Sequence, residues 1–361
     1  MSGHPILSVA GFGPLLLALA ACCAPRADEP SPVELPGTPV SELDPSIWVM
    51  LQASNGDLWF GSNGRGVFRF DGKVWTRLDE DDGLVGGQVR DLVEHSSGDV
   101  LISTRTGVTR FDGHALTPLA IERPSDGDGW VLDPDDAWLV SDWGMRGPLR
   151  YDGERLLELE LTGSREAEAL ARAFPDPVVP PTGIYDIHRD RRGHLWFGTG
   201  AVGVCRFDGT SLDWLHEEPL TTTPEGGSFG IRSILEDASG RFWIGNTRQT
   251  FRMAREASVA EGYRRLRYER EPGLTSTTAD DDPGLTYVAS MAEDSGGVLW
   301  MAAGFHGVWR YDGEELTRFD LPDGSFAIRI LLDDAGQVWA GTVDHGVHVF
   351  DGEAFVAYAV P

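Results

Sequence analysis

The sequence predicts an all-β fold, a seven-bladed β-propeller of four-stranded antiparallel blades. Three observations favour it. A Gly-x-apolar-Trp pattern recurs along the chain, an aromatic-Asp-Gly pattern follows nearly every copy, and neighbouring copies lie about 40 residues apart, the length of one blade. The 45 glycines and 12 tryptophans among 361 residues agree with many short strands joined by tight turns.

The first pattern marks the second strand of each repeat, strand B. Its glycine falls in the hairpin that follows strand A, where the backbone needs a positive φ. Val89–Glu94 is a typical strand A. The third copy is degenerate, and the seven are Gly56–Trp59, Gly98–Leu101, Trp138, Gly193–Trp196, Gly240–Trp243, Gly297–Trp300 and Gly336–Trp339.

The second pattern ends strand C and turns the chain into strand D, because Asp-Gly suits a tight hairpin. Only the fifth repeat, around Phe251–Met253, lacks the Asp-Gly. The six copies are Phe70–Gly72, Phe111–Gly113, Tyr151–Gly153, Phe207–Gly209, Tyr311–Gly313 and Phe350–Gly352. A lone sheet of this kind exposes two apolar faces, so we expect a ring in which each blade packs between two others. How the ring closes is left open.

Several segments resemble the two-component regulator propeller repeat: Asp82–Leu84, Val89–Leu92, Gly193–Thr199 and Gly203–Gly209. The resemblance covers residues 46–361. It implies an extracytoplasmic sensor of the kind found in hybrid histidine kinases, which often respond to carbohydrates. We expect no transmembrane helix, kinase segment or further β-domain in this chain, so any signalling role would run through a separate partner.

The N-terminal segment predicts export. Ile6–Ala21 is apolar but short for a membrane span, and Leu19–Cys22 resembles a bacterial lipobox. We therefore expect residues 1–21 to be a lipoprotein signal peptide and Cys22 to carry the lipid. The alternative is ordinary cleavage and release, because no Lys or Arg precedes the apolar run.

The segment after Cys22 predicts the location and the spacing of the mature protein. Cys23 follows the lipidated residue, which by analogy with bacterial lipoproteins favours the outer membrane of the cell envelope. Residues 22–45 are rich in proline and predict an extended tether, and residues 46–361 form the propeller.

The charge balance excludes some partners. Acidic residues outnumber basic ones by 57 to 30, a net charge of −27, which repels nucleic acid and anionic bilayers. We expect a monomer that touches the membrane only through its lipid and binds a small molecule, a carbohydrate or an envelope protein. Cys205 stands alone in a strand pattern and predicts a buried apolar side chain.

The long insertions predict which face is functional. They are Glu160–Thr182, His216–Ser228 and Ala254–Thr286, and all three are interpreted as crossings from strand D to the next strand A. Such crossings share a face with the B–C loops. The first insertion contains Ser164–Arg172, a short capped helix by composition. Since stability does not force insertions to one side, we expect the ligand on that face.

Two rings of residues are candidates for the ligand site. One comes from the B–C loops, and the other comes from strand A, seven or eight residues before the A–B glycine. The predicted site comprises Arg65, Arg90, Arg146, Arg232, Arg329, His306 and His345, with Tyr185 and Trp48 as stacking surfaces. These side chains suit an anionic or sugar-like ligand. The alternative is internal neutralisation, of Arg90 by Asp91 or Asp186 and of Arg232 by Asp237.

The sequence predicts no catalytic residues, no metal and no cofactor. It has no phosphate-binding glycine loop before a helix, no serine elbow between strand and helix, and no clustered Cys or His with the spacing of metal ligands. Three other hypotheses stay open: a protein-interaction scaffold at the envelope, calcium at the Asp-Gly pairs, and a metal-assisted lyase. The lyase would use His306 and His345 with Asp344 or Asp142.

Overall fold

The computed structural model describes residues 35–124, 128–140, 147–173, 180–217, 220, 230–274, 285 and 287–360. These residues belong to one compact unit, Leu35–Pro361. The predicted signal peptide, the lipid site at Cys22 and the start of the tether lie outside the described residues. Within the described part, no helix is both long and apolar enough to cross a membrane.

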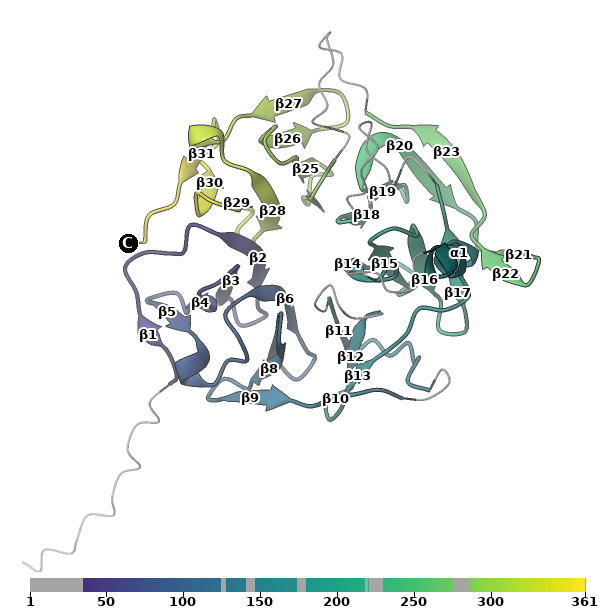
Figure 1. Ribbon diagram of the computed structural model, residues 1–361. Helices are drawn as coiled ribbons and strands as arrows, with labels where there is room; N and C mark the ends of the chain where they lie inside the picture. The colour runs from purple at the N-terminus through teal and green to yellow at the C-terminus, as the bar shows by residue number, and fades with distance from the viewer. Residues whose placement is uncertain are drawn as a thin grey trace, which may run out of the picture. The chain divides into compact units, whose positions relative to one another are not determined.

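Seven small sheets form a seven-bladed β-propeller, as predicted (Figure 1). The first contains β2 (Ile47–Gln52), β3 (Leu58–Ser62), β4 (Val67–Phe70), β5 (Trp75–Leu78) and an outer β1 (Thr38–Pro39). The second contains β6 (Val89–Glu94), β7 (Val100–Thr104), β8 (Gly107–Phe111) and β9 (Leu116–Leu119). The third contains β11 (Ala137–Leu139), β12 (Leu149–Tyr151), β13 (Leu156–Glu158) and an outer β10 (Ile121–Glu122).

The remaining sheets complete the ring. The fourth contains β14 (Ile184–Arg189), β15 (Leu195–Thr199), β16 (Val204–Phe207) and β17 (Leu212–Leu215), with β22 (Tyr263–Arg265) and β21 (Ser258–Ala260) outside them. The fifth contains β18 (Ile234–Glu236), β19 (Phe242–Ile244), β20 (Asn246–Met253) and β23 (Tyr268–Pro272). The sixth contains β24 (Ser290–Glu293), β25 (Leu299–Ala302), β26 (Val308–Tyr311) and β27 (Leu316–Phe319). The seventh contains β28 (Ala327–Leu332), β29 (Val338–Thr342), β30 (Val347–Phe350) and β31 (Phe355–Ala357).

Short helical segments lie between the blades. The helix α1 (Arg165–Ala173) confirms the helix predicted in the first insertion, and the Ser164 hydroxyl accepts a hydrogen bond of 3.1 Å from the backbone N–H of Ala167. Two 3₁₀ turns, η1 (Glu80–Asp82) and η3 (Pro322–Gly324), precede strands β6 and β28. They mark crossings from one blade to the next.

The core lies between blades, where apolar faces of neighbouring sheets meet. Trp59 of the first blade packs at 5.2 Å, centroid to centroid, on Phe111 of the second. Val67 and Leu78 join the same buried cluster as Val89. Burial of these faces supplies the main drive for ring formation, as expected for sheets that cannot cover themselves.

The Asp-Gly pairs are hairpin turns. Asp71 Oδ1 accepts hydrogen bonds of 2.9 Å from the backbone N–H groups of both Lys73 and Val74, and Gly72 has a φ of +86°. The bond from Val74 lowers the pKa of Asp71. Asp112, Asp152, Asp208, Asp312 and Asp351 repeat the turn. One carboxylate oxygen of each is therefore engaged by its own turn, which explains these aspartates without calcium.

A second aspartate, which sequence reasoning missed, anchors the tryptophan of strand B. Asp237 Oδ2 accepts a hydrogen bond of 2.9 Å from Trp243 Nε1, while Oδ1 accepts the backbone N–H groups of Ser239 and Arg241. The same arrangement recurs at Asp190, Asp294 and Asp333. One carboxylate thus shapes the A–B turn and satisfies the buried indole.

Within the described residues the first and seventh blades share no strand, and the ring closes through side-chain packing and hydrogen bonds. Trp339 and Val347 of the seventh blade join one buried cluster with Phe60 of the first. Trp75 Nε1 donates a hydrogen bond of 3.1 Å to the Tyr358 hydroxyl. Elsewhere, Glu94 accepts the backbone N–H of Ser54 in the preceding blade at 2.7 Å. Pairs Glu236–Arg191 and Glu293–Ala238 repeat that link.

The interpretation of the third insertion was wrong over its first half. Residues 254–267 lie between strands C and D of the fifth blade and include the hairpin β21–β22 (Figure 1). Strand β22 pairs in parallel with β17, and the Leu266 backbone N–H donates to Trp214 O at 2.9 Å. The excursion therefore extends the outer edge of the fourth blade. Only residues after β23 belong to a D–A crossing.

The degenerate third repeat also differs from its neighbours. Among the described residues, no strand lies inside β11 in the third sheet. Val140, which follows β11, lies next to the second blade instead, because its backbone N–H donates to Asp91 Oδ2 at 2.7 Å. The inner wall of this blade is therefore supplied by the end of strand B.

Candidate functional site

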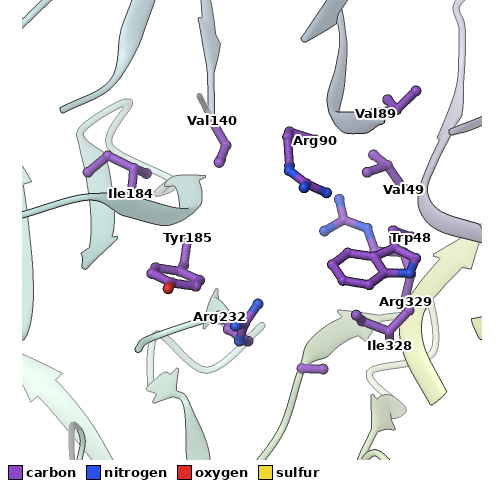
Figure 2. A pocket seen from close by; sticks show the side chains of 11 residues that line it. Trp48, Val49, Val89, Arg90, Val140, Ile184, Tyr185, Arg232, Ile328 and Arg329 are labelled. Carbon is purple, nitrogen blue, oxygen red and sulfur yellow. The ribbon is translucent and has the colours of Figure 1, made fainter. Parts of the chain in front are cut away.

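An axial pocket lies where the inner strands meet (Figure 2). A β-bulge near the start of four strands A adds one residue to the inner strand, and such bulges re-aim side chains. The extra residues are Trp48, Arg90, Tyr185 and Ile328. Among the described residues, the lining is Trp48, Val49, Val89, Arg90, Val140, Ile184, Tyr185, Arg232, Ala289, Ile328 and Arg329. The cavity volume is about 80 Å³.

Five of the nine predicted site residues line this pocket: Trp48, Arg90, Tyr185, Arg232 and Arg329. Figure 2 shows Trp48 and Tyr185 on opposite sides of the space, with the guanidinium groups directed into it. Counting back from the A–B glycine therefore located the inner ring correctly. That these residues bind a ligand stays a prediction.

Each aromatic ring in the pocket carries a guanidinium. The Arg90 Cζ atom lies 5.5 Å from the centroid of the Trp48 ring, and the Arg232 Cζ atom lies 4.4 Å from that of Tyr185. Arg90 Nη1 also donates to Asn63 Oδ1 at 3.1 Å. Asn63 lies in a B–C loop, so the pocket lies toward the face that bears these loops. Arg232 is hydrogen-bonded to the Tyr287 phenol, whose pKa is raised mainly by burial.

The predicted neutralisation of Arg232 by Asp237 is wrong. Asp237 is occupied by Arg241, whose Nε donates to Oδ2 at 2.8 Å, and by the Trp243 indole. The Asp237 carboxylate binds groups of its own A–B turn and strand B, and none of these described contacts reaches Arg232 in the axial pocket. The contacts described for Arg90 go to Asn63 and Trp48, not to the predicted carboxylates.

Two partly buried carboxyl groups, Asp91 and Asp186, directly follow the lining residues Arg90 and Tyr185 in the chain. Asp186 Oδ2 accepts the backbone N–H of Ile234 at 2.7 Å, as Asp91 does for Val140, so each joins neighbouring blades. Burial raises the pKa of Asp186 to about 7, although Arg329 and the bond from Ile234 oppose the shift. Burial raises the pKa of Asp91 as well, against the bond from Val140 and the charge of Arg329.

The predicted loop residues that the structure describes, Arg65, His306 and His345, do not line the axial pocket. Arg65 Nε lies 3.6 Å from Asp44 Oδ2, and His345 Nδ1 lies 2.9 Å from Asp344 Oδ1. His345 lines a separate cavity of about 470 Å³ with Ser41–Pro45 and Ala357–Val360. The His306 backbone N–H donates to Ala303 O at 3.1 Å in its own loop. Arg146 lies outside the described residues.

The lyase hypothesis gains no metal site from the described part of the chain. No group of three or more His, Cys, Asp or Glu side chains there is placed to hold a metal ion. Asp142 lies outside the described residues. Cys205 is fully buried, and burial raises its pKa, which fits the predicted apolar role.

Some lining residues were missed by sequence reasoning. Ala289 and Ile328 stand eight residues before Gly297 and Gly336, so the count that selected Arg90 also selects them. They were passed over because their side chains are apolar. Val140 had no such signal, since the third repeat lacks the inner strand from which to count.

A family comparison decides what the repeats are. The model of the two component regulator propeller matches residues 41–64 and 179–201, which include the A–B hairpins of the first and fourth blades. The chain contains two-component regulator propeller repeats. The regulator propeller repeats thus supply Trp48 and Tyr185 of the axial pocket. No curated protein matches the chain.

Solved structures with a similar fold come from different functional classes. The chain is similar to the extracellular domain of a proposed one-component system from B. thetaiotaomicron, with 17% identity and a TM-score of 0.55 over 88% of this chain and 40% of that one. The extracellular domain of a proposed hybrid two-component system from the same organism is 15% identical, with a TM-score of 0.57 over 88% of this chain and 40% of that one. Virginiamycin B lyase from Staphylococcus aureus is 14% identical, with a TM-score of 0.58 over 87% of this chain and 97% of that one. At these identities the likeness shows the propeller fold alone.

The chain spans about 40% of the length of the first two structures. Their remaining parts have no counterpart in the comparison. The activities and partners of those whole proteins therefore enter only as proposals.

Proposed function

We propose that this protein is an extracytoplasmic, sensor-type propeller that binds a small anionic or sugar-like ligand in the axial pocket. The observation that carries the proposal is the lining of that pocket, where Arg90, Arg232 and Arg329 converge around one cavity. A guanidinium presents several N–H donors in a fixed plane and matches oxyanions in charge and geometry.

The protein's charge makes this clustering notable. The chain carries −27 overall, yet three arginines from different blades meet on its axis. A narrow site with apolar walls strengthens each charge–ligand contact, because water that would screen it is excluded. Val49, Val89 and Ile184 supply such walls.

The extracytoplasmic location is supported by two lines. The N-terminal apolar run and the lipobox-like Leu19–Cys22 favour export and lipidation of Cys22. The two sensor structures from B. thetaiotaomicron that share the fold are extracellular domains. Labelling cells with a radioactive fatty acid tests the anchor: label is expected in the wild type and not in Cys22→Ala, and an unlabelled wild type contradicts lipidation.

Calorimetric titration tests the ligand proposal. The probes are acetate, sulfate, galacturonate and the neutral sugar galactose, each added to the wild type and to Arg90→Ala/Arg232→Ala. We expect binding of at least one probe, weakened at least tenfold in the double variant. The control Arg172→Ala/Arg255→Ala removes the same charge from exposed surface and should bind like the wild type. Equal binding by all three proteins overturns the proposal.

The scaffold hypothesis makes a different prediction. A scaffold should recover one envelope protein in stoichiometric amount from membrane extracts, and this recovery should be unaffected by Arg90→Ala/Arg232→Ala. A ligand sensor should instead show the arginine-dependent titration. The two outcomes separate small-molecule recognition from scaffolding.

A further inference from the structure

A second cavity, which we call the seam cavity, lies where the seventh blade meets the first. Its walls are the segment before β2, the turn into β30 and the C-terminal end of the chain (Figure 1). Among the described residues, the lining comprises Ser41–Pro45, His345–Val347 and Ala357–Val360, none of which lines the axial pocket. Its volume of about 470 Å³ falls within the roughly 300–1,000 Å³ of sites that enclose a whole small molecule.

Hydrogen bonds hold the walls of the seam cavity in place. The Gly346 backbone N–H donates to Pro45 O at 2.6 Å, and the Tyr358 backbone N–H donates to Val347 O at 2.8 Å. The Tyr358 side chain is fixed as well, because its hydroxyl accepts the Trp75 indole N–H at 3.1 Å. The cavity is therefore formed by parts of the chain that are fixed relative to one another.

One wall of the seam cavity carries a buried carboxylate. The Asp44 side chain is only 7% exposed, and its Oδ1 accepts the Ser46 backbone N–H at 2.7 Å. Arg65 Nε lies 3.6 Å from Oδ2, too far for a good hydrogen bond, and the Arg65 side chain is 53% exposed. Water screens such an exposed partner, so the attraction from Arg65 is weak. Asp44 Oδ2 can therefore accept a donor or a cation that enters the cavity.

The rest of the lining combines negative charge with apolar surface. Glu42 adds a second carboxylate, and no lysine or arginine of the described part of the chain lines the cavity. Leu43, Pro45 and Val347 supply apolar walls, and Tyr358 adds an aromatic ring, whose negative face attracts cations. This lining matches an organic cation and disfavours an anion, because a carboxylate held out of water is stabilised by a positive charge.

We propose that the seam cavity binds an organic ammonium ion with an apolar body, its positive nitrogen against Asp44 and its body against Tyr358. The charge of this ligand is opposite to that of an oxyanion in the axial pocket, so the two sites are separate. A primary ammonium can donate a hydrogen bond to Asp44 Oδ2. A quaternary ammonium has no N–H, and it interacts through its charge and with the aromatic ring.

A ligand in the seam cavity also stabilises the closed ring. It contacts the segment before β2 and the segment after β31, which come from the first and the seventh blade. These walls come together only in the folded ring. Since the ligand binds the folded ring and not the unfolded chain, it raises the midpoint of thermal unfolding.

Titration calorimetry tests the proposal with probes of one shape: 2-phenylethylammonium, its N,N,N-trimethyl derivative and the neutral 2-phenylethanol. We expect at least one cation to bind and to raise the thermal midpoint, and the alcohol to bind more weakly by about tenfold or more. The two cations distinguish a primary from a quaternary ammonium. Failure of both cations to bind, or an alcohol that binds as tightly as they do, overturns the proposal.

Two variants locate the bound cation. Asp44→Asn keeps an oxygen for the Ser46 N–H and should weaken binding by about tenfold or more. Ala359→Trp fills the cavity from an exposed position without changing the charge, and it should weaken binding as strongly. The control Asp312→Asn removes a carboxylate that also accepts backbone N–H groups and pairs with an arginine, and it should bind like the wild type.

Unchanged binding in either Asp44→Asn or Ala359→Trp places the cation elsewhere on the acidic surface and overturns the proposal. Because Ala359 is exposed, Ala359→Trp tests the site independently of any loss of stability in Asp44→Asn. Arg90→Ala/Arg232→Ala should bind the cations like the wild type. The seam cavity and the axial pocket are therefore tested by separate titrations, and failure of one leaves the other standing.

Discussion

Gln52 Oε1 accepts a hydrogen bond of 2.6 Å from the backbone N–H of Asp334, and this bond joins the first blade to the seventh. Gln52 stands four residues before the A–B glycine, as do Glu94, Glu236 and Glu293 in their own blades. Each accepts a backbone N–H from the A–B turn of the preceding blade. The closing junction therefore uses the same link as three of the internal junctions.

Gln52→Ala should lower the free energy of unfolding by about 1 kcal/mol, since one inter-blade hydrogen bond at a solvent-accessible site is lost. Gln52→Glu keeps the acceptor and should stay close to the wild type. Chemical denaturation followed by tryptophan fluorescence gives both values. An equal loss in the two variants would show that packing of the side chain, and not the hydrogen bond, matters here.

The buried ion pair between Asp213 and Arg206 should contribute strongly to the stability of the fourth blade. Its Oδ2 lies 2.7 Å from Arg206 Nη2 with both side chains buried, and its Oδ1 lies 2.7 Å from Arg264 Nε of the β21–β22 hairpin. Asp213→Ala should cost about 3–5 kcal/mol, because Arg206 stays buried without its anion. Arg264→Ala should cost about 1 kcal/mol or less, since that arginine is partly exposed. Denaturation midpoints compare the two, and similar losses would contradict this assignment.

Asp237 should contribute more to the free energy of unfolding than an ordinary turn residue. Asp237→Ala removes the acceptor for the Trp243 indole and for two backbone N–H groups, with an expected loss of about 2–3 kcal/mol. Near-ultraviolet circular dichroism should change with it, because Trp243 is buried. Asp112→Ala, in a C–D turn with no tryptophan beside it, is the matched variant and should leave that spectrum unchanged.

Asp186 should make the free energy of unfolding depend on pH between about pH 4 and pH 7. Its folded pKa of about 7 lies above the ordinary value of 3.8, so the folded state holds the proton more tightly than the unfolded chain. Its contribution to stability is full below pH 4 and decreases as the pH rises to 7, by about 2 kcal/mol between pH 5 and pH 7. Denaturation at several pH values should show this slope flattened in Asp186→Asn, and an unchanged slope would contradict the assignment.

The blade repeat was predictable because each feature that defines it is local. A glycine with positive φ, an apolar strand and an Asp-Gly turn lie within one hairpin, so the sequence displays them directly. Strand β23 was not predicted as strand D of the fifth blade, because Tyr268–Pro272 is a charged segment with no Asp-Gly before it. Its place is fixed by pairing with β20, a contact that leaves no local pattern.

The site residues were predictable only where a fixed number of residues separates them from the A–B glycine. The bulged position of strand A faces the axis in four blades, so the offset from the A–B glycine found Trp48, Arg90 and Tyr185. In contrast, Arg65 is engaged by Asp44 from the segment before β2. Such pairings between separate loops depend on the assembled ring, and no spacing in the sequence encodes them.

Three outer rims of the ring carry an added strand within the described part: β1 covers β5, β10 covers β13, and β22 with β21 covers β17. A bare outer strand offers unpaired N–H and C=O groups to any neighbouring molecule and so acts as a template for aggregation. The added strands have bare edges of their own. The outermost ones, β1, β10 and β21, are only two, two and three residues long, shorter than β5, β13 and β17, so they offer a neighbouring copy a shorter template. Short outermost strands of this kind disfavour edge-to-edge pairing between copies of the protein.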